Sequence, residues 1–580
     1  MITTKHIATA QHVIVDSGAA EQFRQLLTPK GPGRRFAFHP GVFLIGMFLS
    51  AHIHAQTHIR LIHKVLTEDL NLDQQYIWGV RKAAVDGKPG WVLSEANLQN
   101  VSRAIKRVLS YGEFMPEDMQ DDEAEQAKRK ANLEQLIDTI ITATLIPRPA
   151  GAANYAIDDS GIWASERARK KIESAPVTEG DEETIIETTG ADLETADPIS
   201  GTTNPLARKR RKRDKSDAGY GVKTAKDGSR SWYYGYALHA LVRVPEDLGD
   251  DTRTEPALVE RVRLTPAGHD IVDVSLELID SIRASGQPIK HLMTDRHYSY
   301  KKIQRWLFNL LKRNISQVVH LRANDQGFRE WDGMLFAAGH AHCPATPQHL
   351  GDIRQPALEA TDQDLEDFYT RIEERQAYAA QRTRPLTVEG ETRWGCPALN
   401  GTVGCPLREG TLQAARQLNL PIVHNPPAHP PQICKQKTVG LTISTPEQAT
   451  ILKTHQKYYG GSRKHVALAG RRTYVEGFFG VLKGDTAANK NRGSSLYTGM
   501  AHASIETAIF SAVANVISLR AWHKKTELGD PTHPLLAPSA RTYGYRYITE
   551  EEAREYSPPP PEPLRQPSEP EESKTKEHSS

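Results

Sequence analysis

The stretch "NYAIDDSGIWA", residues 154–164, marks the point where helical spacing of apolar residues gives way to strand-like alternation. Upstream, residues 41–66 and 94–112 carry apolar side chains at intervals of three and four, as amphipathic helices do. Ser94 stands where a helix cap belongs. We therefore predict a helical N-terminal domain over residues 1–148 and the first strand of a sheet from residue 154.

Downstream of this stretch, β-rich and helical patterns alternate. The segments "SWYYGYALHALVRV", "ALVERVRLT", "PIKHLMTD" and "SQVVHLRA" are typical of strands. The segments "DIVDVSLELIDSIRASG" and "SYKKIQRWLFNLLKRN" are typical of helices, the second with Ser299 as its expected cap. The resulting order is three strands, then helix, strand, helix and strand, which predicts an α/β layer architecture.

The remaining boundaries follow from composition. An acidic run followed by "LARKRRKRDK" predicts a charged, mobile loop over 171–216, inside a first core segment that spans 149–325. Residues 326–464 are rich in Pro and Gly, hold all four cysteines, and are expected to form an inserted subdomain. Helices return over 465–525, and 526–580 is a C-terminal extension that ends in a disordered tail by composition.

Overall composition excludes several classes of protein. With 73 basic and 71 acidic residues among 580, the net charge is only +2, so any DNA binding must come from local patches. Four cysteines are too few for a disulfide scaffold. The most apolar run, residues 36–55, is interrupted by Pro40 and is too short to cross a bilayer. We expect a soluble, cytoplasmic protein with no membrane partner.

Acidic residues stand where two of the predicted strands end. Asp295 closes "IKHLMTD", and ligand sites in open α/β sheets lie just beyond the carboxyl ends of strands. Asp158 and Asp159 are neighbours, so their side chains point to opposite faces and only one can join a cluster with Asp295. The alternative is that each acid simply forms a turn at a strand end.

A third acid lies in "RRTYVEGFFGVLKG", residues 471–484. On a helix, Arg472, Glu476 and Lys483 project toward roughly one side, beside an apolar stripe that would seat the helix on a core. The alternative is a surface helix with one ion pair. Three converging carboxylates repel one another unless divalent cations neutralise them, and oxygen-only ligands suit Mg²⁺ or Mn²⁺. Two such ions can hold both the attacking and the leaving oxygen of a phosphoryl displacement.

These segments resemble the bacterial insertion-sequence DDE transposases, whose catalytic core is ribonuclease H-like. The resemblance covers about residues 154–325 and 465–515. It is carried by "AIDDSG", "WYYGYALHALV", "MTDRHYS" and the Arg-x3-Glu-x6-Lys pattern of "RTYVEGFFGVLKG". It implies a mixed five-stranded sheet flanked by helices, with a subdomain inserted before the last catalytic helix. Two positions depart from the family pattern: Ala469 replaces a Tyr, and His297 replaces a Gly.

The resemblance also implies an activity. Asp158, with Asp159 as the alternative, would join Asp295 and Glu476 as catalytic ligands of two Mg²⁺ or Mn²⁺ ions. The enzyme would cut the ends of a transposon and transfer the strands to target DNA. Its partners would be the terminal inverted repeats and the target duplex. It would act in the nucleoid, as a homodimer in the synaptic complex. Two alternatives stay open: a catalytically silent DNA-binding descendant, and a nuclease without joining activity.

Several cations are expected to hold DNA. The resemblance assigns phosphate contacts to Arg472 and Lys483, and it points to Arg296 and Tyr298 beside Asp295. The basic run adds Arg208, Lys209, Arg210 and Arg211, for which pairing with the preceding acidic loop is the alternative.

All four cysteines lie inside the insertion. "GHAHCP", "WGCPALNGTVGCP" and "QICKQ" have the composition of turns, and they could deliver Cys343, Cys396, Cys405 and Cys434 to one structural Zn²⁺ site. The spacing lacks a paired C-x-x-C, so buried thiols that pack as small hydrophobic side chains are the alternative.

Overall fold

The computed structural model describes residues 2–28, 35–84, 89–147, 151–165, 216–224, 229–245, 255–321, 327–357, 360–484 and 497–536. The charged loop predicted over 171–216 lies outside this part of the chain except for Ser216, and so does the tail after residue 536.

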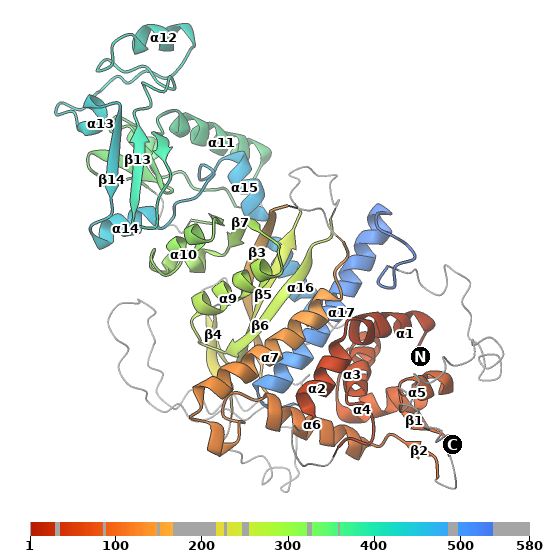
Figure 1. Ribbon diagram of the computed structural model, residues 1–580. Helices are drawn as coiled ribbons and strands as arrows, with labels where there is room; N and C mark the ends of the chain where they lie inside the picture. Colours follow the sequence, from red (N-terminus) through yellow and green to blue (C-terminus); the bar gives the residue numbers. More distant parts are fainter. Residues whose placement is uncertain are drawn as a thin grey trace, which may run out of the picture.

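A mixed sheet forms the centre of the molecule (Figure 1). Its strands are β3 (Ala153–Trp163), β4 (Gly219–Thr224), β5 (Arg230–Val244), β6 (Leu258–Pro266), β7 (Ile289–Thr294) and β8 (Ser316–Val319). The order is β4-β5-β3-β7-β8, and β6 also pairs with β5. β4, β5 and β6 run antiparallel to their neighbours, whereas β7 and β8 run parallel to β3 and to each other.

The predicted mixed α/β architecture is therefore confirmed, with six strands instead of the five expected. The additional strand is β4, which the sequence pattern did not reveal because its "GYGVKT" is rich in glycine. It pairs with residues 230–235 of β5, and β6 pairs with residues 236–243 farther along the same long strand. The extra strand thus lengthens one edge of the sheet without changing the order of the others.

Helices cover both faces of the sheet. On one face, Tyr155 and Ile157 of β3 pack in a cluster with α9 (Ile271–Ala284) and α10 (Leu307–Lys312). On the other face, Ala156 and Ile162 belong to a cluster that includes α16 (Thr473–Lys483) and α17 (Met500–Thr526). This division follows from the alternation of side chains along a strand.

The N-terminal helices share their core with the sheet. They are α1 (Thr4–Ala10), α2 (Ala19–Leu27), α3 (Gly41–His54), α4 (Ile59–Lys64), α5 (Leu72–Ile77), α6 (Glu95–Leu109) and α7 (Glu123–Thr142), with a small ribbon of β1 (Arg81–Lys82) and β2 (Trp91–Val92). Their buried residues fall in one cluster with α17 and the even-numbered side chains of β3, and Figure 1 shows them gathered around α17. The boundary expected at residue 148 therefore does not separate two cores.

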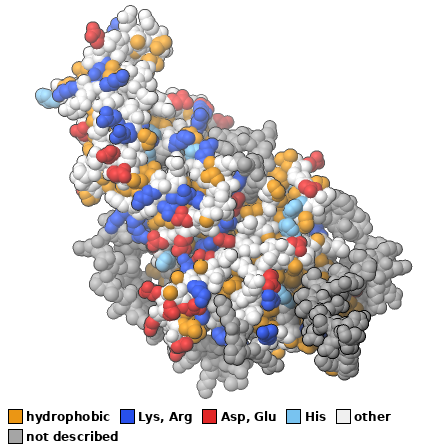
Figure 2. All heavy atoms as spheres, in the orientation of Figure 1, with side chains coloured by type: hydrophobic (Ala, Val, Ile, Leu, Met, Phe, Trp, Pro, Cys, Tyr) orange, Lys and Arg blue, Asp and Glu red, His pale blue; other side chains and the backbone are white. Residues whose placement is uncertain are grey.

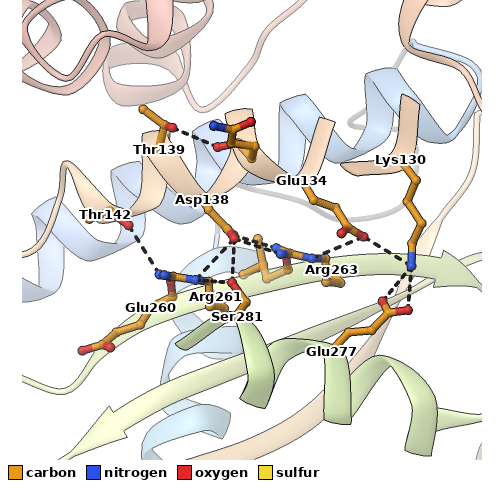
Figure 3. Close-up of polar contacts among 12 residues, drawn as sticks. Lys130, Glu134, Asp138, Thr139, Thr142, Glu260, Arg261, Arg263, Glu277 and Ser281 are labelled. Carbon is orange, nitrogen blue, oxygen red and sulfur yellow. Dashed lines mark hydrogen bonds and ion pairs between the residues drawn. The ribbon is translucent and has the colours of Figure 1, made fainter. Parts of the chain in front are cut away.

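A charged seam also fastens α7 to the sheet (Figure 3). Arg263 of β6 donates to both carboxylate oxygens of Asp138, at 2.7 and 2.9 Å, and lies 3.4 Å from a carboxylate oxygen of Glu134. Lys130 reaches Glu277 of α9 at 2.7 Å. Buried arginines require such partners because an unpaired charge is costly away from water. These ion pairs fix α7 across the β6 edge.

Helix α17 is long and apolar enough to cross a membrane by length and composition, and it is the one such helix among the residues that the structure describes. Of its most apolar window, 94% is buried inside the protein. The core helix of a soluble protein has the same length and composition, and the burial of α17 is consistent with a core helix of this kind.

The inserted subdomain has its own core. Its elements are β9 (Arg329–Trp331), β10 (Met334–Ala337), β11 (His340–His342), α11 (Asp362–Ala377), β12 (Gln381–Arg384), β13 (Glu391–Gly395), α12 (Thr411–Gln417), α13 (Gln432–Lys435), β14 (Thr438–Thr442), α14 (Pro446–Leu452) and α15 (Arg463–Gly470). They build two three-stranded sheets around a separate hydrophobic cluster that continues onto α10. In Figure 1 this subdomain projects from the body of the molecule.

A candidate carboxylate site at the ends of the parallel strands

Strand register brings two of the predicted acids together. The parallel pairing of β3 with β7 ends at Ile157 and Thr294, and the next residue of each strand is Asp158 and Asp295. The sequence pattern predicted that Asp158 ends its strand. Instead, β3 continues beyond it to Trp163 along β5. Asp158 lies where parallel pairing stops, which leaves its carboxylate beside that of Asp295.

The two adjacent aspartates face opposite sides of the sheet. Asp158 and Ser160 point toward α16, as their contacts with that helix show. Asp159 lies on the other face; burial raises its pKa, the charge of His297 lowers it, and Asp295 raises it. Only Asp158 therefore shares a face with Glu476.

Helix α16 crosses this face with its cations against β3. Arg472 donates a hydrogen bond to Asp158 at 2.9 Å and forms an ion pair with Glu476 at 2.6 Å. At the other end of the helix, Lys483 donates to the hydroxyl of Ser160. Glu476 stands in the first turn, where the helix dipole favours an acid, and its side chain is 50% exposed. The stripe predicted from sequence is thus the edge of α16 that faces β3.

The cations around Asp158 do not offset what raises its pKa. Burial is the largest cause, the charges of Asp159 and Asp295 add to it, and Arg472 opposes it, which together bring the pKa of Asp158 to about 7. Because like charges in a partly buried site disfavour ionisation, an additional cation would stabilise this cluster. Among the described residues, no group of three or more His, Cys, Asp or Glu side chains is already close enough to hold a metal ion.

Sequence reasoning missed one residue of the site, His320. The pairing of β7 with β8 ends at Thr294 and Val319, so His320 follows β8 as Asp295 follows β7. Burial lowers the pKa of His320, as does the Arg472 charge, whereas its hydrogen bond to the Ala469 carbonyl raises it. The available signal was the position of this histidine at the end of the strand segment "SQVVH".

The residues predicted beside Asp295 separate into two environments. Arg296 is exposed next to the acids and is free to meet a ligand from solvent. Tyr298 is only 2% exposed, and its hydroxyl bonds Ser275 of α9 at 2.8 Å. The predicted DNA contact of Tyr298 is therefore corrected: its ring packs 4.5 Å from that of Trp306 and holds the turn after β7 in place.

The other predicted residues lie elsewhere. The basic run Arg208, Lys209, Arg210 and Arg211 falls outside the described residues. The cysteines lie in the inserted subdomain as free thiols. A hollow of about 1040 Å³ lies between α7 and α9, and none of the three predicted acids lines it.

Comparison with protein-family models, with curated proteins and with solved structures gives no match for this chain. Any inference about its function therefore rests on its own residues.

Proposed function

We propose that this chain is a metal-dependent DNA transposase of the insertion-sequence type, built on a ribonuclease H-like core. The observation that carries the proposal is the path of α16 across β3. It sets the Arg-x3-Glu-x6-Lys residues against Asp158 and Ser160, with Asp295 on the neighbouring strand. Segments more than 300 residues apart in sequence thus supply acids and cations to one place.

The residues present fit divalent metal ions. The donors are carboxylate oxygens, which Mg²⁺ and Mn²⁺ prefer, and the pKa of Asp158 is raised by burial and by its acidic neighbours, so a bound cation would stabilise its ionised form. The guanidinium of Arg472 already stands between Asp158 and Glu476 as a substitute cation. Asp158, Asp295 and Glu476 would hold two ions, which when bound would neutralise charge on a phosphodiester during displacement.

The cations of α16 would then act on DNA. Arg472 would exchange its carboxylate partners for a phosphate oxygen, to which a planar guanidinium binds in bidentate fashion. Lys483 would position a second phosphate as a point charge from the far end of the helix. Their contribution to the reaction is to align the scissile bond with the acids and to offset the charge that develops there.

The surface around the site supports a polyanionic partner. Figure 2 shows Lys and Arg side chains gathered where the inserted subdomain meets the body of the molecule. Exposed cations of this region include Lys302 after β7 and Lys464 of α15. Such a patch gives salt-dependent binding to duplex DNA even when the net charge of the chain is near zero. Joining two transposon ends would require a homodimer.

The test is a cleavage and strand-transfer assay with the full chain. A labelled duplex carrying the DNA that flanks the coding sequence serves as donor, and a supercoiled plasmid serves as target, with Mg²⁺ or Mn²⁺ present. The proposal predicts cutting and joining that Asp158→Ala, Asp295→Ala and Glu476→Ala each abolish. The matched control is Asp367→Ala, which removes an exposed acid of α11 in the inserted subdomain.

The outcomes separate the possible functions. Cutting without joining would identify a nuclease, and DNA binding without either reaction would identify a silent descendant. The second of these has one observation in its favour, because Arg472 bridges Asp158 and Glu476 and could hold the acids permanently. Metal-dependent cutting that persists in all three alanine variants would overturn the proposed active site.

A further inference from the structure

Three of the four cysteines of the inserted subdomain occupy turns of one kind. Cys343, Cys396 and Cys405 are each followed directly by proline. In each turn, the backbone carbonyl of the cysteine accepts a hydrogen bond from an N–H three or four residues on. Cys434 lies in the short helix α13. Turns of this kind present a thiol at a fixed angle from rigid backbone, as structural metal sites require.

Backbone pairing places Cys396 next to Cys434. Strands β13 and β14 pair up to Gly395 and Thr438, and the N–H of Cys396 then donates to the carbonyl of Lys437 at 3.4 Å. Lys437 is three residues after Cys434. Both cysteines therefore lie at the same end of the β12-β13-β14 sheet.

Cys405 is tied to the same end by a side chain of its own turn. Arg408 donates hydrogen bonds to three backbone carbonyls of residues 433–436, at 2.5 to 3.3 Å. Those carbonyls lie on both sides of Cys434, so the Cys405 turn is clamped onto α13. The guanidinium also brings a positive charge beside the thiols.

Cys343 reaches this end of the sheet from the other side. Its N–H donates to the carbonyl of Tyr378 at 2.9 Å, just before β12 begins at Gln381. Gln381 pairs with Gly395, the residue that precedes Cys396. The ends of β11 and β13, the Cys405 turn and helix α13 thus deliver the four cysteines to one end of the sheet.

Cations stand beside the thiols. Three hydrogen bonds hold the Arg408 guanidinium against the backbone around Cys434, and Lys435 follows Cys434 directly in the chain. A group of four thiolates around a divalent ion carries a net negative charge, which these two cations would offset.

We infer that Cys343, Cys396, Cys405 and Cys434 form a structural zinc site that closes one end of the inserted subdomain. Four thiolates in tetrahedral geometry are a preferred zinc environment, with Zn–S distances of about 2.3 Å. Among the described residues, these four side chains do not stand at coordination distances from one common point. Binding of zinc would draw the four sulfurs together and couple the metal to folding of the loops.

Metal content of the full chain tests this inference. Purified under reducing conditions, the chain is expected to contain one zinc ion, to lose it to a thiol-modifying mercurial, and to have a lower Tm after removal. Co²⁺ in place of zinc is expected to give thiolate charge-transfer bands and tetrahedral d–d bands. Zinc-free protein whose Tm does not respond to added zinc would overturn the inference, as would two disulfides found by thiol counting in denaturant.

Paired variants separate ligation from packing. Cys405→Ser and Cys434→Ser are expected to lose the zinc, whereas Val403→Ala, which removes a buried side chain from the same loop, is expected to keep it. Retention of zinc by both serine variants would overturn the inference. Asp295→Ala is expected to keep the zinc as well, so a failure of this site and a failure of the proposed catalytic site give different results.

Discussion

The carboxylate site and the interior of the inserted subdomain handle polar groups in opposite ways. At the carboxylate site, Glu476 is half-exposed, Asp158 is partly buried, and Arg472 lies between them. In the subdomain, Arg375 donates to the hydroxyl of Tyr459 at 2.9 Å, and that hydroxyl bonds the ring of fully buried His342 at 2.6 Å. The first arrangement places three acids near an accessible edge; the second pairs Arg375, Tyr459 and His342 with one another inside the protein.

This difference indicates what each region can do. Charged groups beside the half-exposed Glu476 can exchange partners more readily than fully buried ones, so in the proposed complex Arg472 would give up a carboxylate for a phosphate. Buried polar networks are costly to disturb, and they specify one packing arrangement. We therefore expect changes at the carboxylate site to alter activity and changes in the subdomain interior to alter stability.

The largest expected effect is a loss of activity at the carboxylate site without a loss of stability. Asp295→Asn keeps the shape of the side chain but removes a negative charge with which the proposed site would hold cations. DNA cleavage is expected to fall by at least about 10³-fold, ~4 kcal/mol in the barrier. The free energy of unfolding should not decrease, because the mutation relieves repulsion with Asp158. Parallel cleavage assays and urea titrations measure both, and a large fall in stability would break the contrast.

The converse variant lies in the subdomain. Trp394 is fully buried and packs edge-to-face against Phe336. Trp394→Ala is expected to destabilise the subdomain by about 3–4 kcal/mol through lost burial and a cavity. Hydrogen exchange should show the loss in residues 327–465 and leave the central sheet protected. Equal loss of protection in β3 and β7 would mean that the two cores unfold as one unit.

Much of the fold was predictable because its strands are apolar and its helices amphipathic. The α/β order follows from strand patterns alone, whereas the neighbouring positions of Asp158 and Asp295 were expected from their places at strand ends and from the family resemblance. The helix expected from Ser299 is instead a 3₁₀ turn followed by the short α10, because Tyr298 and Trp306 are both buried against α9. Tertiary packing there overrides local propensity.

The details of the site depend on register and side-chain direction, which the sequence does not show. The place of His320 beside Asp295 follows from the parallel pairing of β7 with β8. That Arg472 bridges two acids depends on where α16 crosses β3. The roles predicted for Asp158, Asp295 and Glu476 in catalysis stay predictions, as does the zinc site.

A pH titration tests whether a buried polar group of the inserted subdomain contributes to stability, as the comparison with the carboxylate site predicts. Burial lowers the pKa of His340 to about 3, whereas an unfolded histidine titrates near 6.5. Between these values the unfolded chain binds a proton that the folded chain does not, so stability rises with pH and is lost as the pH falls below about 6.5. Lowering the pH to 5 is expected to cost about 2 kcal/mol for this residue.

The measurement is the pH dependence of the free energy of unfolding of the subdomain. His340→Gln should reduce its slope between pH 5 and 6.5 by about 1.4 kcal/mol per pH unit. His429→Gln, at an exposed position, should leave the slope unchanged. An unchanged slope in His340→Gln would show that His340 does not titrate with unfolding.

The smallest expected effect is on DNA affinity, at the far end of α16. Lys483 contacts Ser160, and in the proposed complex it would exchange this contact for a phosphate. Lys483→Ala is expected to weaken binding to duplex DNA about tenfold and to reduce the slope of log K against log salt by about 0.9. Lys525→Ala, at an exposed position in the last turn of α17, serves as the control. If Lys483→Ala leaves the slope of log K against log salt unchanged, the DNA phosphates do not contact this end of α16. Lys483 would then serve only to hold the helix on the sheet through Ser160.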